Sequence, residues 1–244
     1  MAGPPSLAWR RDIDRFYLLM DRLARRAGGP RMLADLGNSR DWPSRGVYIF
    51  FDPSEPRSDS GTGPRAVRVG THALTPGSRS TLRQRLAQHR GSAGGAGNHR
   101  GSIFRLLVGQ ALLASGGLSR TPSWGVKSTA AAAAAFLGIR QESLAAAELP
   151  VERAVSAYIG TLPFLWLAVD DEPGPESRRG FIERNAIGLL TNFDRAALDP
   201  PSSTWLDRAS DRPLVAGSGL WNQRHVDEAY DPALLDLLEN MIGG

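Results

Sequence analysis

Cysteine is absent from this 244-residue chain, and long apolar runs are absent too. The first absence excludes a disulfide framework and every zinc site built on thiolates. No stretch approaches the 18 consecutive apolar residues of a membrane-spanning helix, and the N-terminal residues lack the apolar centre of a secretory signal. We therefore expect a cytoplasmic protein that makes no membrane contact. The length suits one large domain with its own hydrophobic core.

Acidic residues are missing from Gly61 to Gln141, and the chain's single lysine is Lys127. Ten arginines and that lysine fall in this acid-free stretch, although the net charge of the whole chain is only +4. Ordinary surfaces intersperse both signs, so the stretch predicts a surface that faces a polyanion, with nucleic acid first; a solvated face is the alternative. Arginine suits phosphate recognition, although genome composition would produce the same bias.

Helical spacing of apolar residues alternates with short β-branched and aromatic runs along the chain. The spacing predicts helices over residues 12–27, 82–90, 102–113, 130–135, 143–158, 181–193 and 232–242. Pro150 is a candidate start for the later part of the fifth helix. The short runs predict strands over 47–51, 66–69 and 162–169, the third being a buried central strand. We expect the first two strands to be antiparallel and residues 52–65 to form a loop.

The helix over 82–90 carries two polar side chains beside its apolar stripe. Thr81 and Gln84 form a capping-box pattern at its start, and Gly91 is a natural stop. Arg85 and His89 are i,i+4 neighbours at the margin of the stripe. A semi-buried guanidinium needs an anion, which is either an internal carboxylate or a bound phosphate. The nearby sequence supplies no acid.

These residues resemble the GIY-YIG nucleases over about 45–90 and 160–193. Gly46-Val47-Tyr48 stands where the family has its first motif, and Arg68-Val69-Gly70 stands where it has the second. Arg85 and His89 match the Arg-x-x-x-His pair of the following helix. Glu183 in FIERNAIGLL matches the catalytic glutamate on a helix after the third strand. The resemblance implies an α+β fold in which a small, mainly antiparallel sheet is flanked by helices.

The parts of the chain outside the matched stretches predict additions to that fold. We expect an N-terminal helical segment over 1–44, a nuclease domain over 45–195 with a helical insertion at about 92–157, and a C-terminal extension over 196–244 packed on the domain.

Tyr158-Ile159-Gly160 spells the second motif, but it ends a helical pattern and does not precede the helix with Arg85, so it is not the counterpart.

The chemistry implied by the resemblance is hydrolysis of DNA phosphodiester bonds with one divalent ion, Mg²⁺ or Mn²⁺. Glu183 would hold the metal, and Arg85 would neutralise the scissile phosphate. Tyr48, helped by His89, would orient or deprotonate the attacking water. A tyrosine hydroxyl is a weak base at neutral pH, so this role needs a positive charge nearby.

Arg68 departs from the family pattern, because it replaces the second motif tyrosine. A guanidinium cannot act as a base, but it can act electrostatically on a phosphate. His72 is a substitute proton acceptor, or alternatively an ordinary surface histidine. The shared expectation for the remaining candidates is contact with nucleic acid; they are Arg68, His72, Arg79, His99, Arg100 and Asn192. For His99 and Arg100, the alternative is that their glycine-rich segment is simply a flexible connector. Asn192 is the candidate for the asparagine that the family has further along the helix, but its spacing from Glu183 is unusually short.

Three functions stay open on these grounds. The first is a metal-dependent endonuclease acting on duplex DNA, for which double-strand cutting needs a homodimer or two successive nicks. The second is a nucleic-acid-binding protein on the same scaffold that does not cleave, and the third is an RNA-directed nuclease. In the segment SGLWNQRHV over 218–226, we expect Trp221 to pack against the core; substrate recognition or a subunit contact is the alternative use of this segment.

Overall fold

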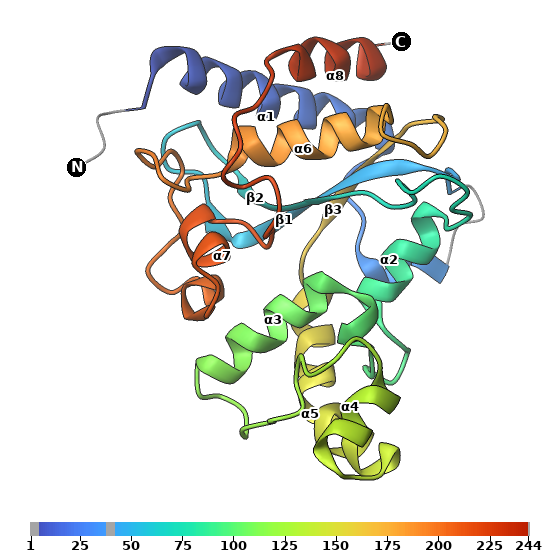
Figure 1. Ribbon diagram of the computed structural model, residues 1–244. Helices are drawn as coiled ribbons and strands as arrows, with labels where there is room; N and C mark the ends of the chain where they lie inside the picture. Colours follow the sequence, from blue (N-terminus) through green and yellow to red (C-terminus); the bar gives the residue numbers. More distant parts are fainter. Residues whose placement is uncertain (1–4, 38–41, 244) are drawn as a thin grey trace.

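The computed structural model describes residues 5–37 and 42–243 (Figure 1). Residues 1–4 and 38–41 of the expected N-terminal segment lie outside the described residues. The α-helices are α1 Leu7–Ala27, α2 Leu82–Arg90, α3 Ile103–Ala114, α4 Ala130–Leu137, α5 Gln141–Gly160, α6 Arg178–Leu190, α7 Pro213–Ser218 and α8 Ala233–Gly243. Short 3-10 turns are η1 Leu33–Gly37, η2 His99–Gly101 and η3 Leu206–Ala209, and the strands are β1 Gly46–Pro56, β2 Pro64–Gly70 and β3 Phe164–Ala168.

The sheet is small and antiparallel, with β1 between β2 and β3. Tyr48 pairs with Gly70 on one side and with Trp166 on the other. The α+β fold expected from the sequence is confirmed. β1 continues to Pro56, five residues past the predicted strand, because pairing along the hairpin uses backbone groups and the polar side chains of 52–56 do not prevent it.

Two helical layers bury the two faces of the sheet. In Figure 1, α1, α6 and α8 lie over one face, whereas α2, α3 and α5 lie on the other. Val47 and Ile49 of β1 pack into the first layer, and Tyr48 and Phe50 pack into the second. This alternation follows from the two-residue period of a strand. Both faces of β1 are therefore buried, and β1 positions β2 and β3 on either side of it.

Helix α1 begins five residues before the predicted start. The side chain of Ser6 accepts a hydrogen bond from the Trp9 N–H at 3.1 Å and thereby caps the helix, and Gly28 ends it in the left-handed region with φ 71°. Helix α8 packs along α1, where Arg15 pairs with Glu239. None of the helices within the described residues has the length and apolarity needed to cross a bilayer.

Helix α2 carries out the local pattern that its sequence predicts. The Thr81 side chain accepts from the Gln84 N–H, the Gln84 side chain accepts from the Thr81 N–H, and Gly91 follows the last turn. His89 is fully buried against the sheet. The capping box fixes the start of α2, and with it the position of Arg85 relative to the sheet.

The segment between α2 and β3 contains α3, α4 and α5. Helix α5 runs unbroken through Pro150, which therefore does not open a new helix. The Arg105 guanidinium donates to the Glu152 carboxylate with both side chains buried, and the Tyr158-Ile159-Gly160 triplet forms the last turn of α5. The placement of this triplet agrees with its exclusion as the second motif.

The C-terminal segment covers the outer edge of β2. The Trp221 N–H donates to the Val67 carbonyl at 2.7 Å, and the side-chain amide of Asn222 accepts from the Val69 N–H and donates to the Val69 carbonyl. Trp221 itself is fully buried in the core, as predicted. Edge groups of β2 are thus paired without a fourth strand.

Candidate active site

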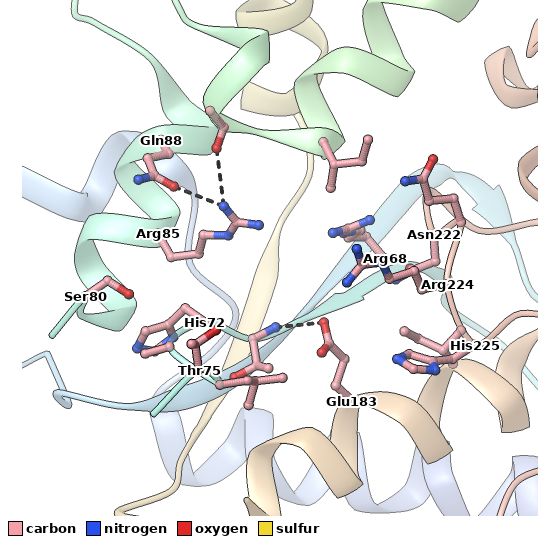
Figure 2. A pocket seen from close by; sticks show the side chains of 17 residues that line it. Arg68, His72, Thr75, Ser80, Arg85, Gln88, Glu183, Asn222, Arg224 and His225 are labelled. Atoms are coloured by element: carbon pink, nitrogen blue, oxygen red, sulfur yellow. Dashed lines mark hydrogen bonds between the residues drawn. The ribbon is translucent and has the colours of Figure 1, made fainter. Parts of the chain in front are cut away.

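A cavity of about 710 Å³ opens where β2 ends (Figure 2). Its walls come from parts of the chain far apart in sequence: the loop after β2, helix α2, the start of α3, helix α6 and the segment after α7. The ionisable and amide side chains that line it are Arg68, His72, Arg85, Gln88, Glu183, Asn222, Gln223, Arg224 and His225.

Glu183 reaches the cavity from the first half of α6, whose N-terminus is capped by Ser177. Its Oε1 accepts a hydrogen bond from the Thr71 N–H at 3.1 Å (Figure 2), while Oε2 accepts none from the described residues. Burial raises the pKa of this carboxyl above its usual range, against the opposing effect of the Arg68 guanidinium. The carboxylate is therefore held in place and has one oxygen available to a ligand.

Arg85 enters the same cavity from α2. Its Nη1 donates to Gln88 Oε1 at 3.0 Å and to the Gly101 carbonyl at 3.3 Å, both uncharged acceptors (Figure 2). Its Nε is buried and has no hydrogen-bond partner, and no carboxylate within the described chain pairs with it. The helical spacing had placed this guanidinium beside the apolar stripe without a nearby acid, and no described carboxylate neutralises its charge.

Arg68 lies on the face of β2 that carries Gly70, opposite Phe50 of β1. Its guanidinium is buried, donates to the Trp221 carbonyl and lies 5.4 Å from the centre of the Phe104 ring. Burial lowers the pKa of Arg68, while the nearby Tyr48 hydroxyl and Glu183 carboxylate oppose this effect. Among the residues described, no acid forms an ion pair with it.

Tyr48 lies behind the cavity wall. Its hydroxyl is 2.8 Å from Nε2 of His89, whose Nδ1 is 2.8 Å from Ser102 Oγ, and all three side chains are buried. Gly70 makes this possible, because a Cβ there would overlap the Tyr48 hydroxyl. Tyr48 and His89 thus form an internal hydrogen-bonded chain next to the cavity and do not line it.

His72 lines the cavity and is buried, so its interpretation as an ordinary surface histidine is wrong. It lies two residues after the end of β2, and the Ser44 carbonyl is 3.2 Å from its Nε2. Its Nδ1 has no partner within the described chain. Burial, together with the Arg179 and Arg85 charges, lowers the pKa of His72 to about 4, against the opposing effect of the hydrogen bond to the Ser44 carbonyl. The ring is therefore neutral at pH 7.

Three residues predicted to contact nucleic acid lie elsewhere. His99 is buried with its Nδ1 2.9 Å from Glu152 Oε1, and Arg100 forms a two-pronged pair with Glu148 at 2.7 and 2.8 Å. Asn192 is buried after the end of α6, where its Oδ1 accepts from the Leu198 N–H. None of the three lines the cavity, and the acids that pair with His99 and Arg100 come from helix α5. Their contact with nucleic acid stays a prediction.

Arg79 is exposed on the loop between β2 and α2, one residue from the cavity-lining Ser80. Its predicted contact with DNA stays a prediction. The acid-free stretch does not form one continuous basic surface, however. Arg65, Arg100 and Arg105 from this stretch are neutralised inside the protein by Glu55, Glu148 and Glu152, all of which lie outside it.

Asn222, Arg224 and His225 were not among the predicted site residues, and substrate recognition was only the alternative use of their segment. All three line the cavity, and Arg224 is exposed there without an ion pair to any described residue. His225 has a left-handed backbone with φ 63°, which is uncommon outside glycine. The polar cluster in the sequence WNQRH was the available signal, but no periodicity links it to β2.

A divalent ion suits the donor set at Glu183. No group of three or more histidine and acidic side chains capable of holding a metal occurs in the described part of the chain. Mg²⁺ often binds through one or two carboxylates while it keeps several waters. The free Oε2 of Glu183 and the open cavity fit such a site, whereas they do not fit a closed structural metal centre.

The comparisons with known proteins agree with this geometry. A family model described as the GIY-YIG domain matches residues 8–244, which is nearly the whole chain. No curated protein matches the chain, and no solved structure does. The match spans helices α2 to α8 as well as the sheet, and includes Arg85 and Glu183. The chain belongs to the GIY-YIG family, a family of nucleases.

Proposed function

We propose that this protein is a metal-dependent endonuclease that hydrolyses phosphodiester bonds of duplex DNA. The observation that carries the proposal is the convergence of Glu183, Arg68 and Arg85 on one cavity. One carboxylate with a free oxygen faces two guanidiniums that have no acidic partner among the described residues. This combination suits a phosphate together with a cation better than it suits an internal ion pair.

Arg85 is the proposed ligand of the scissile phosphate. Its unpartnered Nε and its position at the cavity wall support this role, because a planar guanidinium offers paired donors to two phosphate oxygens. Arg68 lies deeper and adds positive charge below the same oxygens. Preorganised charges of this kind stabilise negative charge that develops in the transition state.

Glu183 is the proposed metal ligand, through its free Oε2. When bound, Mg²⁺ or Mn²⁺ would supply Lewis-acid stabilisation of the leaving oxygen. The hydrogen bond from the Thr71 N–H fixes the carboxylate and holds Oε2 toward the cavity.

Water activation has two candidates in this chain. Tyr48 occupies the motif position, but its hydroxyl is sequestered with His89, so a water in the cavity reaches it only after a side-chain shift. His72 lines the cavity, is neutral, and holds an unpartnered Nδ1. We therefore propose that His72 orients the attacking water and that Tyr48 and His89 support the wall behind it.

A non-cleaving nucleic-acid-binding protein is the second candidate. The replacement of the second motif tyrosine by Arg68 and the burial of Tyr48 favour it, since both remove hydroxyl groups from the cavity. An RNA-directed nuclease uses the same charges, which do not discriminate between the two sugars.

Nicking of supercoiled plasmid with Mg²⁺ or Mn²⁺ tests the proposal. The wild-type protein is compared with Glu183→Ala and with Glu176→Ala, which removes an exposed carboxylate a short distance upstream on the same side of the protein. We expect cutting by wild type and Glu176→Ala, no cutting by Glu183→Ala, and equal gel shifts for all three. A linear product at early times would indicate a homodimer, and a nicked intermediate would indicate successive cuts.

The other outcomes separate the rival functions. Gel shifts without cutting by any of the three proteins would replace the endonuclease with the non-cleaving binder. Cutting of structured RNA but not of plasmid would make RNA the substrate. Full cutting by Glu183→Ala would remove Glu183 from the site.

A further inference from the structure

His225 shares with Glu183 a position between two adjoining cavities. The first is the cavity at the end of β2, and the second, of about 780 Å³, lies along the start of α6. Of the residues that the structure describes, Leu74, Glu183 and His225 line both. Figure 2 shows the imidazole of His225 next to the Glu183 side chain, on a segment that comes from the other end of the chain.

The ring of His225 is tied to the helix that carries Glu183. Its Nδ1 lies 2.8 Å from Glu228 Oε1, and Glu228 also accepts a hydrogen bond from the Arg184 Nε. Arg184 is the residue after Glu183 on α6. The link through Glu228 therefore fixes His225 relative to Glu183, and it leaves Nε2 without a hydrogen-bond partner among the described residues.

The backbone of His225 is held in an uncommon conformation. A φ of 63° costs free energy in a residue with a side chain, and such conformations persist where the surroundings hold them. On one side Asn222 is bound to Val69 of β2, and on the other Val226 is buried in the core. Both anchors hold the strained turn that carries the ring into the cavity.

The hydrogen bond at Nδ1 decides which chemistry the ring can perform. An Nδ1–H that donates to a carboxylate leaves a lone pair on Nε2, and this carboxylate–histidine arrangement is characteristic of metal-bound imidazoles. We propose that His225 Nε2 is a second protein ligand of the divalent ion held by Glu183, and that Glu228 orients it. The inference rests on the metal-dependent function proposed above and adds a nitrogen donor to it.

A mixed nitrogen and oxygen donor set changes the expected metal preference. Carboxylate and water suit Mg²⁺, whereas an imidazole favours first-row transition metals over it. The site should therefore bind Mn²⁺ more tightly than Mg²⁺. A glutamate that binds alone with waters would show a smaller difference.

Electron spin echo envelope modulation of Mn²⁺ bound to the full chain tests this inference without any cleavage assay. We expect nitrogen-14 modulation from a directly bound imidazole in the wild type. His225→Asn should abolish it, and asparagine is chosen because it tolerates a positive φ. His72→Gln should retain it, which shows that the signal does not come from the other histidine of the cavity.

Mn²⁺ titration of the same proteins provides the affinities. His225→Asn should raise the Kd for Mn²⁺ by about 10-fold to 100-fold, and Glu228→Gln should raise it by about 10-fold because the orienting charge is lost. Circular dichroism confirms that each variant is folded.

The outcomes distinguish this inference from the function on which it rests. Mn²⁺ that binds the wild type without nitrogen modulation, and that is lost in Glu183→Gln, would overturn the role of His225 and keep the metal site at Glu183. Modulation that survives in His225→Asn would also overturn it. No Mn²⁺ binding by the wild type at millimolar concentration, together with no plasmid cutting, would overturn both proposals.

Discussion

The Tyr48 hydroxyl lies 2.8 Å from Nε2 of His89, and neither side chain reaches solvent. The other ring nitrogen of His89 meets Ser102 Oγ, and the same oxygen caps helix α3 through the Arg105 N–H. Strand β1, helix α2 and the start of α3 are therefore joined by one buried series of hydrogen bonds. Tyr48 and His89 thus stabilise the cavity wall that they lie behind.

Tyr48→Phe should destabilise the protein, because it leaves His89 Nε2 buried without its partner. We expect a loss of about 1–3 kcal/mol in the free energy of unfolding, measured by urea denaturation. Tyr230→Phe is the control, since its hydroxyl bonds Asp12 in a half-buried position and should contribute less. Equal unfolding free energies for wild type and Tyr48→Phe would contradict the expectation. Cleavage by the folded variant separately reports any role in water activation.

Arg85→Ala should reduce cleavage about 100-fold to 1000-fold, which is the usual effect of removing one preorganised donor to a developing charge. Arg85→Lys should recover only part of the rate, because an ammonium keeps the charge but not the planar pair of donors. Arg83→Ala is the matched control, since this exposed arginine of the same helix contacts only the Leu36 carbonyl. Single-turnover cleavage with saturating protein measures each rate. A similar loss for Arg83→Ala would indicate general electrostatics instead of a phosphate contact.

Arg68→Met should separate stability from function. The buried guanidinium has no acidic partner among the described residues, so its removal should change the unfolding free energy by no more than about 1 kcal/mol, or increase it. Cleavage should fall about 100-fold if the charge acts on the phosphate. Urea denaturation and plasmid nicking on one preparation measure both effects. Cleavage at the wild-type rate would show that Arg68 has only a structural role in the cavity wall.

His72 should make the protein less stable in acid. Its pKa is about 4 in the folded state and near 6.5 when unfolded, so between these values the unfolded chain binds the extra proton. Unfolding free energy should therefore fall as the pH falls from about 6.5 to about 4, by up to about 3 kcal/mol from this group. His72→Gln keeps a donor for the Ser44 carbonyl and should flatten this part of the curve. An unchanged slope in His72→Gln would show that another group, such as the buried His89, is responsible.

Local patterns, namely strand alternation, a capping box and helical spacing, predicted the three strands, helix α2 and the place of Arg85, whereas Glu183 was assigned through the family resemblance. The third strand was expected to be central, but β3 lies at an edge of the sheet and β1 is the central strand. The burial of His99 and Arg100 was not predictable, because their partners Glu152 and Glu148 lie about 50 residues further along the chain. An acid-free segment says nothing about which acids fold onto it.

His225 illustrates the same limit at the site. Its neighbours Glu183 and Glu228 are separated by the whole segment that forms α7, and the pairing of residues 221 and 222 with β2 and of Arg184 with Glu228 brings them together. Nothing in the sequence indicates the positive φ of His225, because this backbone conformation is usually found at glycine. Tertiary pairing across a strand edge, and not local propensity, builds this wall.

Strand β2 and the segment that pairs with its outer edge are 153 residues apart in the sequence. During synthesis, Arg68, Arg85 and Glu183 are therefore made before Asn222 and His225. The cavity acquires its last wall only after these later residues have been made and have paired with β2. The charged residues alone do not form the closed cavity, so its assembly depends on this long-range pairing.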